Sequence, residues 1–146
     1  MAIVVDPEGL TALRAARAGA IVPDDVHDLL RDAERAKRSG DFEEAERLLQ
    51  EALLTDPSRA AVWSTVGALE DQLGEVSVAR EAYRAALSLE DDDKTALALA
   101  RLHSSIGEWD DAIAVATHLS LNGRDETTRA MATRLAHEAK ARKATS

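Results

Sequence analysis

The sequence contains no cysteine among its 146 residues, which excludes disulfides, thiolate zinc sites and thiol nucleophiles together. No apolar run approaches the ~20 residues that cross a membrane, and the apolar start Ile3-Val4-Val5 is too short for a signal peptide. Glycine-rich phosphate loops and nucleophile elbows are also missing. We therefore expect a cytoplasmic protein that is not an enzyme, contacts no membrane and carries no cofactor.

Metal-binding patterns are equally scarce. None of the four histidines has a histidine or a carboxylate four residues away, which is the spacing of helical zinc ligands. Glu90–Asp93 resembles a calcium loop only in charge, because the glycine and the last glutamate of such a loop are absent. We expect no metal site, histidines on the surface or in a groove, and a solvated acidic turn in which an aspartate caps the next helix.

Basic residues are few in the middle of the chain. The formal net charge is -9, and fourteen acids face four bases between Asp41 and Asp93. An acidic surface of this kind repels phosphate backbones, so we do not expect a nucleic-acid ligand. A basic or neutral protein segment suits it better, although solubility alone also accounts for acidic faces.

What the sequence does contain is an internal repeat. Gly40, Gly74 and Gly107 are 34 and then 33 residues apart, and each is followed by an acid and an apolar residue. Fixed distances beyond each glycine lead to two further columns, Ala45, Ala79 and Ala112, and then Ala52, Ala86 and Leu119. The glycines suit left-handed caps that end helices, and the alanines suit positions where two helices approach closely. Pairs of helices that stack on one another are therefore predicted.

Apolar periodicity and capping residues predict eight helices. Their expected ranges are Pro7–Ala18 with a stop at Gly19, Asp24–Ser39, Phe42–Thr55, Arg59–Leu73, Val76–Leu89, Asp92–Ile106, Trp109–Leu121 and Asp125–Lys143. The last helix carries Met131 and Leu135 on one face, which favours a cap over the open end of the stack. A partner-binding amphipathic helix is the alternative.

Residues 60–93 resemble a tetratricopeptide repeat over its full length. The residues that carry the resemblance are Trp63, Gly67, Gly74, Ala79, Tyr83 and Ala86, in the order of that family. Residues 26–59 are similar but have Leu29 and Ala33 in place of the tryptophan and the first glycine, and residues 93–124 diverge further. The resemblance implies an all-α fold, a right-handed α–α superhelix of three helix-turn-helix repeats. The repeats would occupy 25–124, an N-terminal segment and helix 1–24, and a C-terminal capping helix and tail 125–146.

In this family the first helix of each pair lines a concave groove that binds peptides or helices of partner proteins. Transferred to this sequence, the groove positions are His27, Leu30, Arg31, Glu34, Lys37, Arg38, Ala61, Ser64, Thr65, Ala68, Asp71, Gln72, Lys94, Leu97, Ala98, Arg101, Ser104 and Ser105. The small residues in the middle of this set would leave room for apolar side chains of a guest. The basic residues would form a positive rim for flanking acids.

Some members of the family clamp a free C-terminal carboxylate with lysine, asparagine and arginine side chains. Here Leu30, Glu34, Thr65 and Ala98 stand at four of those positions, and only Lys94 fits. We therefore expect no preference for a C-terminal carboxylate.

The resemblance leaves the specific role open. A general adaptor or scaffold is the leading interpretation. A small cytoplasmic secretion chaperone, similar to those of type III translocators, is the alternative, because these share the plan of a leading helix, three repeats and a trailing helix. The third interpretation is self-association through the N-terminal segment, since Ile3-Val4-Val5 is unusually apolar for a free tail.

Overall fold

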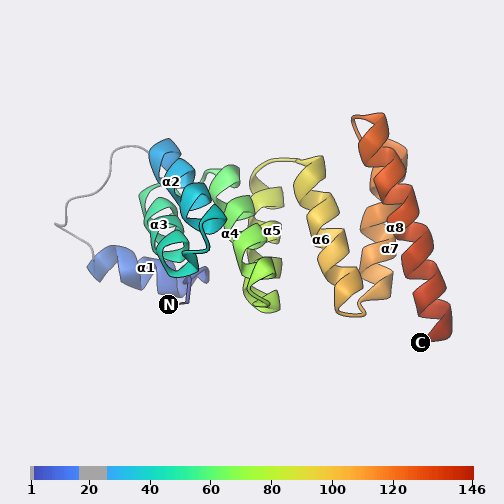
Figure 1. Cartoon of the computed structure of the whole chain (residues 1–146), viewed down its shortest axis with the longest axis horizontal. Helices are drawn as coiled ribbons and strands as arrows, with labels where there is room; N and C mark the ends of the chain where they lie inside the picture. Colours follow the sequence, from blue (N-terminus) through green and yellow to red (C-terminus); the bar gives the residue numbers. More distant parts are fainter. Residues whose placement is uncertain (1, 17–25) are drawn as a thin grey trace. The chain divides into compact units, whose positions relative to one another are not determined.

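The computed structural model describes residues 2–16 and 26–146, which form eight helices (Figure 1). Their bounds are α1 Pro7–Ala16, α2 Val26–Arg38, α3 Phe42–Thr55, α4 Ala60–Gln72, α5 Val76–Leu89, α6 Asp93–Ser105, α7 Trp109–Asn122 and α8 Glu126–Thr145. The helices and the all-α repeat class are as predicted. Ala18, Gly19 and Asp24, at which we expected one helix to end and the next to begin, lie outside the described residues.

The chain divides into two compact units, one ending at Leu89 and the other beginning at Glu90. In the first unit, α2 pairs with α3 and α4 pairs with α5, while α3 contacts α4 and α2 contacts α4. In the second unit, α6 pairs with α7, and α8 packs on α7 and also contacts α6. None of the helices in the described ranges is long and apolar enough to cross a membrane.

The three repeat glycines close identical turns between paired helices. Gly40, Gly74 and Gly107 have φ angles of 82°, 80° and 80°, the left-handed conformation that glycine adopts without strain. The N–H after each glycine donates to a carbonyl five residues earlier: Asp41 to Ala36 at 2.9 Å, Glu75 to Glu70 at 2.8 Å and Glu108 to His103 at 2.9 Å. This Schellman pattern confirms the predicted caps and places Ala36, Glu70 and His103 at equivalent positions.

Small residues let the paired helices approach. Ala45, Ala79 and Ala112 are fully buried, as the repeat predicted. At Gly67, a Cβ atom would lie 2.5 Å from Cδ1 of the Tyr83 ring, so the glycine of α4 makes room for the aromatic side chain of α5. These contacts explain why the two residue types recur at fixed spacing.

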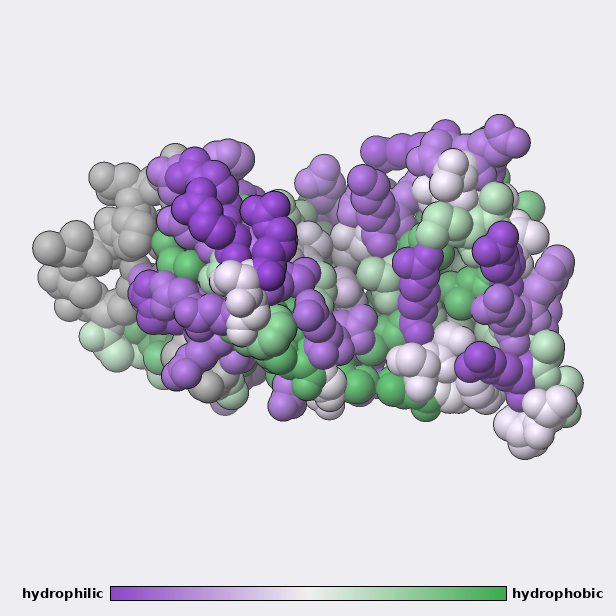
Figure 2. All heavy atoms as spheres, in the orientation of Figure 1, coloured by the Kyte–Doolittle hydropathy of each residue, from purple (hydrophilic) through white to green (hydrophobic). Residues whose placement is uncertain are grey.

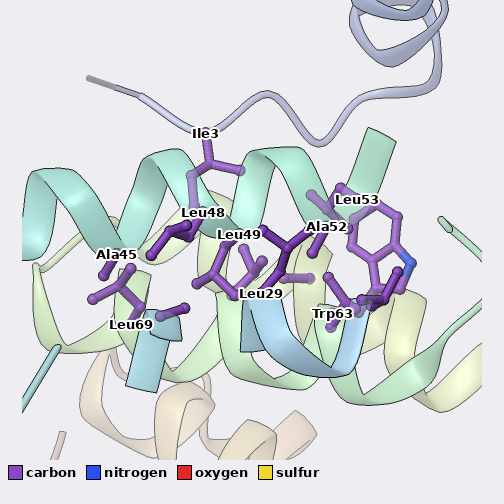
Figure 3. Packing of buried hydrophobic residues seen from close by; sticks show 14 of the residues in the cluster. Ile3, Leu29, Ala45, Leu48, Leu49, Ala52, Leu53, Trp63 and Leu69 are labelled. Carbon is purple, nitrogen blue, oxygen red and sulfur yellow. The ribbon is translucent and has the colours of Figure 1, made fainter. Parts of the chain in front are cut away.

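The N-terminal segment lies on α3 of its own chain. Figure 3 shows Ile3 directed toward α3 beside Leu48, and its side chain is buried in the core of the first unit. The amide of Gln50 holds the neighbouring backbone from both sides, because Val4 N donates to Gln50 Oε1 at 2.5 Å and Gln50 Nε2 donates to Val4 O at 3.1 Å. With α1 also contacting α3, Ile3-Val4-Val5 has an intramolecular role. Self-association through it stays a prediction.

The last helix packs through alanines. Ala132, Ala136 and Ala139 are buried, whereas Met131 is 37% exposed. The expectation that Met131 belongs to the packed face is therefore wrong, because a close approach of α8 to α7 favours methyl groups over long side chains. Asp125 caps this helix by accepting a hydrogen bond from Thr128 N at 2.7 Å, and Asp92 caps α6 through Thr95 N at 3.0 Å, as expected for the acidic turn.

Candidate protein-binding surface

The first helices of the two pairs in the first unit share one accessible surface. We call it the α2–α4 surface, because α2 and α4 contact one another. Every predicted site residue on these helices is exposed or half-buried, since the opposite stripes of α2 and α4 supply the core. The members are His27, Leu30, Arg31, Glu34, Lys37 and Arg38 from α2 and Ala61, Ser64, Thr65, Ala68, Asp71 and Gln72 from α4.

The half-buried part of this surface includes an uncharged strip of Leu30, Ser64, Thr65 and Ala68, and the charged residues Glu34 and Lys37 of α2 are half-buried as well. The two hydroxyls already donate within their own helix, Ser64 Oγ to Ala61 O at 3.1 Å and Thr65 Oγ1 to Ala61 O at 2.7 Å. An apolar guest side chain placed here would therefore leave neither hydroxyl donor without a hydrogen-bond acceptor. The surface suits small and medium apolar anchors.

Fewer basic residues of α2 are available to a guest than the sequence suggested. Arg31 Nη2 lies 2.9 Å from Asp28 Oδ1, so an acid of the same helix already neutralises this guanidinium. Lys37 and Arg38 make no ion pair with any residue in the described part of the chain, and Arg38 is exposed. Figure 2 shows hydrophilic residues gathered where Figure 1 places α2. Positive charge available to a guest is concentrated at the C-terminal end of α2.

The third set of predicted residues belongs to α6, in the second unit. Lys94, Ala98, Arg101, Ser104 and Ser105 are exposed or half-buried. Leu97 is an exception, because it is 6% exposed and packs with Leu119 and Ala132. Its assignment to a groove is a correction: the side chain is a core residue that joins α6 to its neighbours.

Lys94 sits close to the start of α8. The pKa of Asp125 is lowered chiefly by its hydrogen bonds from Thr128, and the charges of Arg129 and Lys94 lower it further. Asp93 ties the same region together by accepting a hydrogen bond from Arg124 N at 2.7 Å. Lys94 therefore contributes to the electrostatics within the second unit as well as to its accessible surface.

Two buried carboxylates were not predicted from the sequence. Glu70 of α4 is 1% exposed and Glu46 of α3 is 8% exposed, and both line a pocket of about 470 Å³ with Ala2, Leu73, Glu75 and Val78. Burial, reinforced by the charge of Glu46, raises the pKa of Glu70 to about 7. The sequence feature that could have indicated the burial of Glu70 is its position within the apolar stripe of α4, directly after Leu69.

His103 occupies the position of α6 that Glu70 occupies in α4, four residues before the turn glycine. It is 3% exposed, so the expectation that the histidines lie on the surface or in a groove is wrong for this residue. The repeat itself could have indicated that His103 is buried, because the equivalent position of the first helix pair holds the buried Ala36.

Comparison with known proteins supports the repeat assignment. Residues 95–130 match the family model of the tetratricopeptide repeat. No curated protein matches this sequence significantly.

Solved structures similar to this chain include secretion chaperones and peptide-binding domains. A type III secretion system complex from Aeromonas hydrophila has a TM-score of 0.77 at 17% identity, covering 97% of this chain and 100% of that chain. The type III secretion chaperone SycD of Yersinia enterocolitica, in complex with a peptide of the translocator YopD, has a TM-score of 0.73 at 18% identity, covering 86% and 99%. The first repeat domain of Spaghetti (RPAP3), bound to the HSP90 peptide SRMEEVD, has a TM-score of 0.73 at 16% identity, again covering 86% and 99%. At such identities the likeness concerns the fold.

Proposed function

We propose, on the premise that this chain is a tetratricopeptide-repeat protein, that it is a protein-interaction module which binds a segment of another protein on the α2–α4 surface. The observation that carries the proposal is the half-buried strip of Leu30, Ser64, Thr65 and Ala68, in which the hydroxyl donors are already satisfied. A guest with small apolar anchors buries area there without losing hydrogen bonds. Its binding would be micromolar for a short segment, about -8 kcal/mol.

Charge complementarity narrows the class of guest. Lys37 and Arg38 at the end of α2 favour acidic residues beside the apolar anchors of a guest, because opposite charges attract. Arg31 contributes less to this preference, since it is already paired with Asp28. The role proposed is that of an adaptor or scaffold without chemistry of its own, in the cytoplasm. The exposed residues of α6, including Arg101, offer the second unit a separate surface of the same kind.

A dedicated secretion chaperone is the second candidate. One observation favours it: the similarity to the type III secretion complex from Aeromonas hydrophila extends over 97% of this chain and thus includes the flanking helices α1 and α8. The structure of PcrH in complex with the chaperone binding region of PopD likewise covers 98% of this chain. A gene for a membrane-inserting secreted protein next to the coding gene, and a partner that stays soluble only with this chain, would favour this role over a general adaptor.

A clamp for a C-terminal carboxylate is not proposed. Glu34 is an acid at a position where such a clamp needs a neutral or basic group, and Leu30 offers no charge. Wild-type protein should bind a peptide with a free C-terminus and its amidated form equally. The double variant Leu30→Lys, Glu34→Asn should gain a preference for the free carboxylate, measurable by fluorescence anisotropy. A preference already present in the wild type would contradict this part of the proposal.

One substitution pair tests the binding surface. Ser64→Arg places a long charged side chain on the half-buried strip, whereas Ser77→Arg makes the same change at an exposed position of α5. Both variants should keep the helical circular dichroism spectrum. Partners captured from the source cell and quantified by mass spectrometry should be depleted with Ser64→Arg and retained with Ser77→Arg. Equal capture by the two variants, or loss with Ser77→Arg alone, would reject the α2–α4 surface.

A further inference from the structure

The turn between α6 and α7 brings together three potential metal ligands from different local elements. His103 lies near the end of α6, Glu108 follows Gly107, and Asp111 belongs to the first turn of α7. One ring nitrogen of the histidine and one oxygen of each carboxylate all lie within 4.8 Å of one another. His103 Nδ1 lies 3.6 Å from Glu108 Oε1.

The histidine supplies an independent reason to expect a ligand. It is 3% exposed, and its Nδ1 atom is buried with no hydrogen-bond partner among the described residues. Buried polar atoms are nearly always satisfied, so an exception calls for an explanation such as a bound ion. This nitrogen faces the Glu108 carboxylate, and a cation held between the two groups would give the nitrogen the partner that no hydrogen bond supplies.

The backbone of this turn holds two of the three residues in a fixed relation. Glu108 N donates to His103 O at 2.9 Å, and Gly107 takes the left-handed conformation with φ 80°. The hydrogen bond spans the turn, so the histidine and the glutamate cannot separate without breaking it. Such preorganisation is what a metal site requires.

The other two turns provide an internal comparison. The equivalent residues are Ala36, Asp41 and Glu44 in the first turn and Glu70, Glu75 and Val78 in the second. Neither set contains a histidine, although all three turns share one backbone pattern. The cluster in the third turn is therefore a property of its side chains and not of the turn type. Spacing along one helix does not reveal it, since its members straddle two helices.

We propose that His103, Glu108 and Asp111 form a binding site for a divalent transition-metal ion of the zinc class. One imidazole nitrogen and two carboxylate oxygens, with a water molecule, complete the four ligands that zinc takes. Calcium and magnesium need six or more oxygen ligands, which three residues with one nitrogen do not supply. Asp111 is exposed and Glu108 is partly exposed, so both side chains have room to move inward onto an ion. The ion would clamp the end of α6 to the start of α7.

Metal titration of the full-length, tag-free protein tests this site. Zinc should bind with a stoichiometry of one per chain in competition with a chromophoric chelator, and should raise the midpoint of thermal unfolding. Cobalt should give the visible absorption of a tetrahedral complex. Asp111→Asn should weaken zinc binding by about tenfold or more, and His103→Gln should abolish the tetrahedral cobalt spectrum.

The controls separate this site from adventitious binding. His118→Gln changes an exposed histidine of α7 outside the cluster and should leave the zinc affinity unchanged. Because His103 is buried and its replacement can disturb folding, Asp111→Asn carries the decision. Unchanged zinc affinity in Asp111→Asn, a loss in His118→Gln equal to that in Asp111→Asn, or binding of calcium as tight as that of zinc would each overturn the proposal.

Discussion

Glu70 makes the stability of the first unit depend on pH. Its side chain is 1% exposed, and its Oε1 atom has no hydrogen-bond partner within the described residues. Burial and the charge of Glu46 raise its pKa from 4.5 to about 7. The folded protein therefore binds a proton more readily than the unfolded chain does between these two values. The free energy of unfolding should be highest below pH 4.5 with respect to this group, fall as the pH rises to 7, and change little above.

The magnitude follows from the width of that window. A shift from 4.5 to about 7 corresponds to a ceiling of about 3 kcal/mol, at roughly 1.4 kcal/mol for each pKa unit. The pocket beside Glu70 admits solvent, so screening reduces the expected loss to about 1–2 kcal/mol between pH 5 and pH 8. Glu70→Gln keeps the shape of the side chain and removes its charge. This variant should be more stable than the wild type at pH 8 by about the same amount.

Urea unfolding at pH 5, 6, 7 and 8 measures this effect. In a Trp109→Phe background the fluorescence reports Trp63 alone, and Trp63 lies in the first unit with its Nε1 donating to Pro57 O at 2.7 Å. Glu81→Gln is the matched control, because Glu81 is an exposed acid of α5 paired with Arg84. The pH slope should be flattened in Glu70→Gln and unchanged in Glu81→Gln. An identical slope in Glu70→Gln and the wild type, or a variant less stable at pH 8, would refute the buried-carboxylate reasoning.

Four further predictions concern packing, turn geometry and binding. Ala79→Leu should overfill a fully buried site and lower the free energy of unfolding by about 1–3 kcal/mol in urea titrations; an unchanged midpoint would contradict the close helix approach. Gly74→Ala meets no atom within 4 Å but has φ 80°, so it should cost about 1–2 kcal/mol through the backbone alone. Gly67→Ala should lower the free energy of unfolding by about 1–3 kcal/mol through its clash with Tyr83. In double-mutant cycles, Tyr83→Leu should relieve part of the loss caused by Gly67→Ala and none of the loss caused by Gly74→Ala. Arg101→Glu should leave the thermal midpoint unchanged and should weaken, in calorimetry, the binding of a segment that occupies the exposed surface of α6. Unfolding by this substitution would show that the residue is structural.

The repeat made most of the fold predictable. A glycine that needs a left-handed turn, followed at fixed distances by alanines, determines where helices end and where they touch, and Gly40, Gly74 and Gly107 adopt that conformation. The tertiary position of the N-terminal segment was not predictable. It depends on long-range contacts, the burial of Ile3 in the core and the pairing of the Gln50 amide with the Val4 backbone, which no local periodicity encodes.

The accessibility of the candidate site residues was predictable in outline and less so in detail. Helical register correctly separated the accessible stripes of α2 and α4 from their buried stripes. The same register wrongly predicted that Leu97 is accessible. Leu97 lies on the corresponding stripe of α6, but α8 packs against α6 in the second unit and buries this side chain. The charge of Arg31 was likewise overestimated, since only the structure shows which rotamer pairs it with Asp28.

Mapping a bound partner by nuclear magnetic resonance addresses the central claim most directly. A partner segment identified by capture is titrated into isotope-labelled protein, and backbone amide shifts are followed residue by residue. Our account predicts that the largest shifts fall on Leu30, Ser64, Thr65 and Ala68, with α5 unaffected. Shifts that instead cluster on α1 and α5 would contradict it, because those helices lie outside the α2–α4 surface.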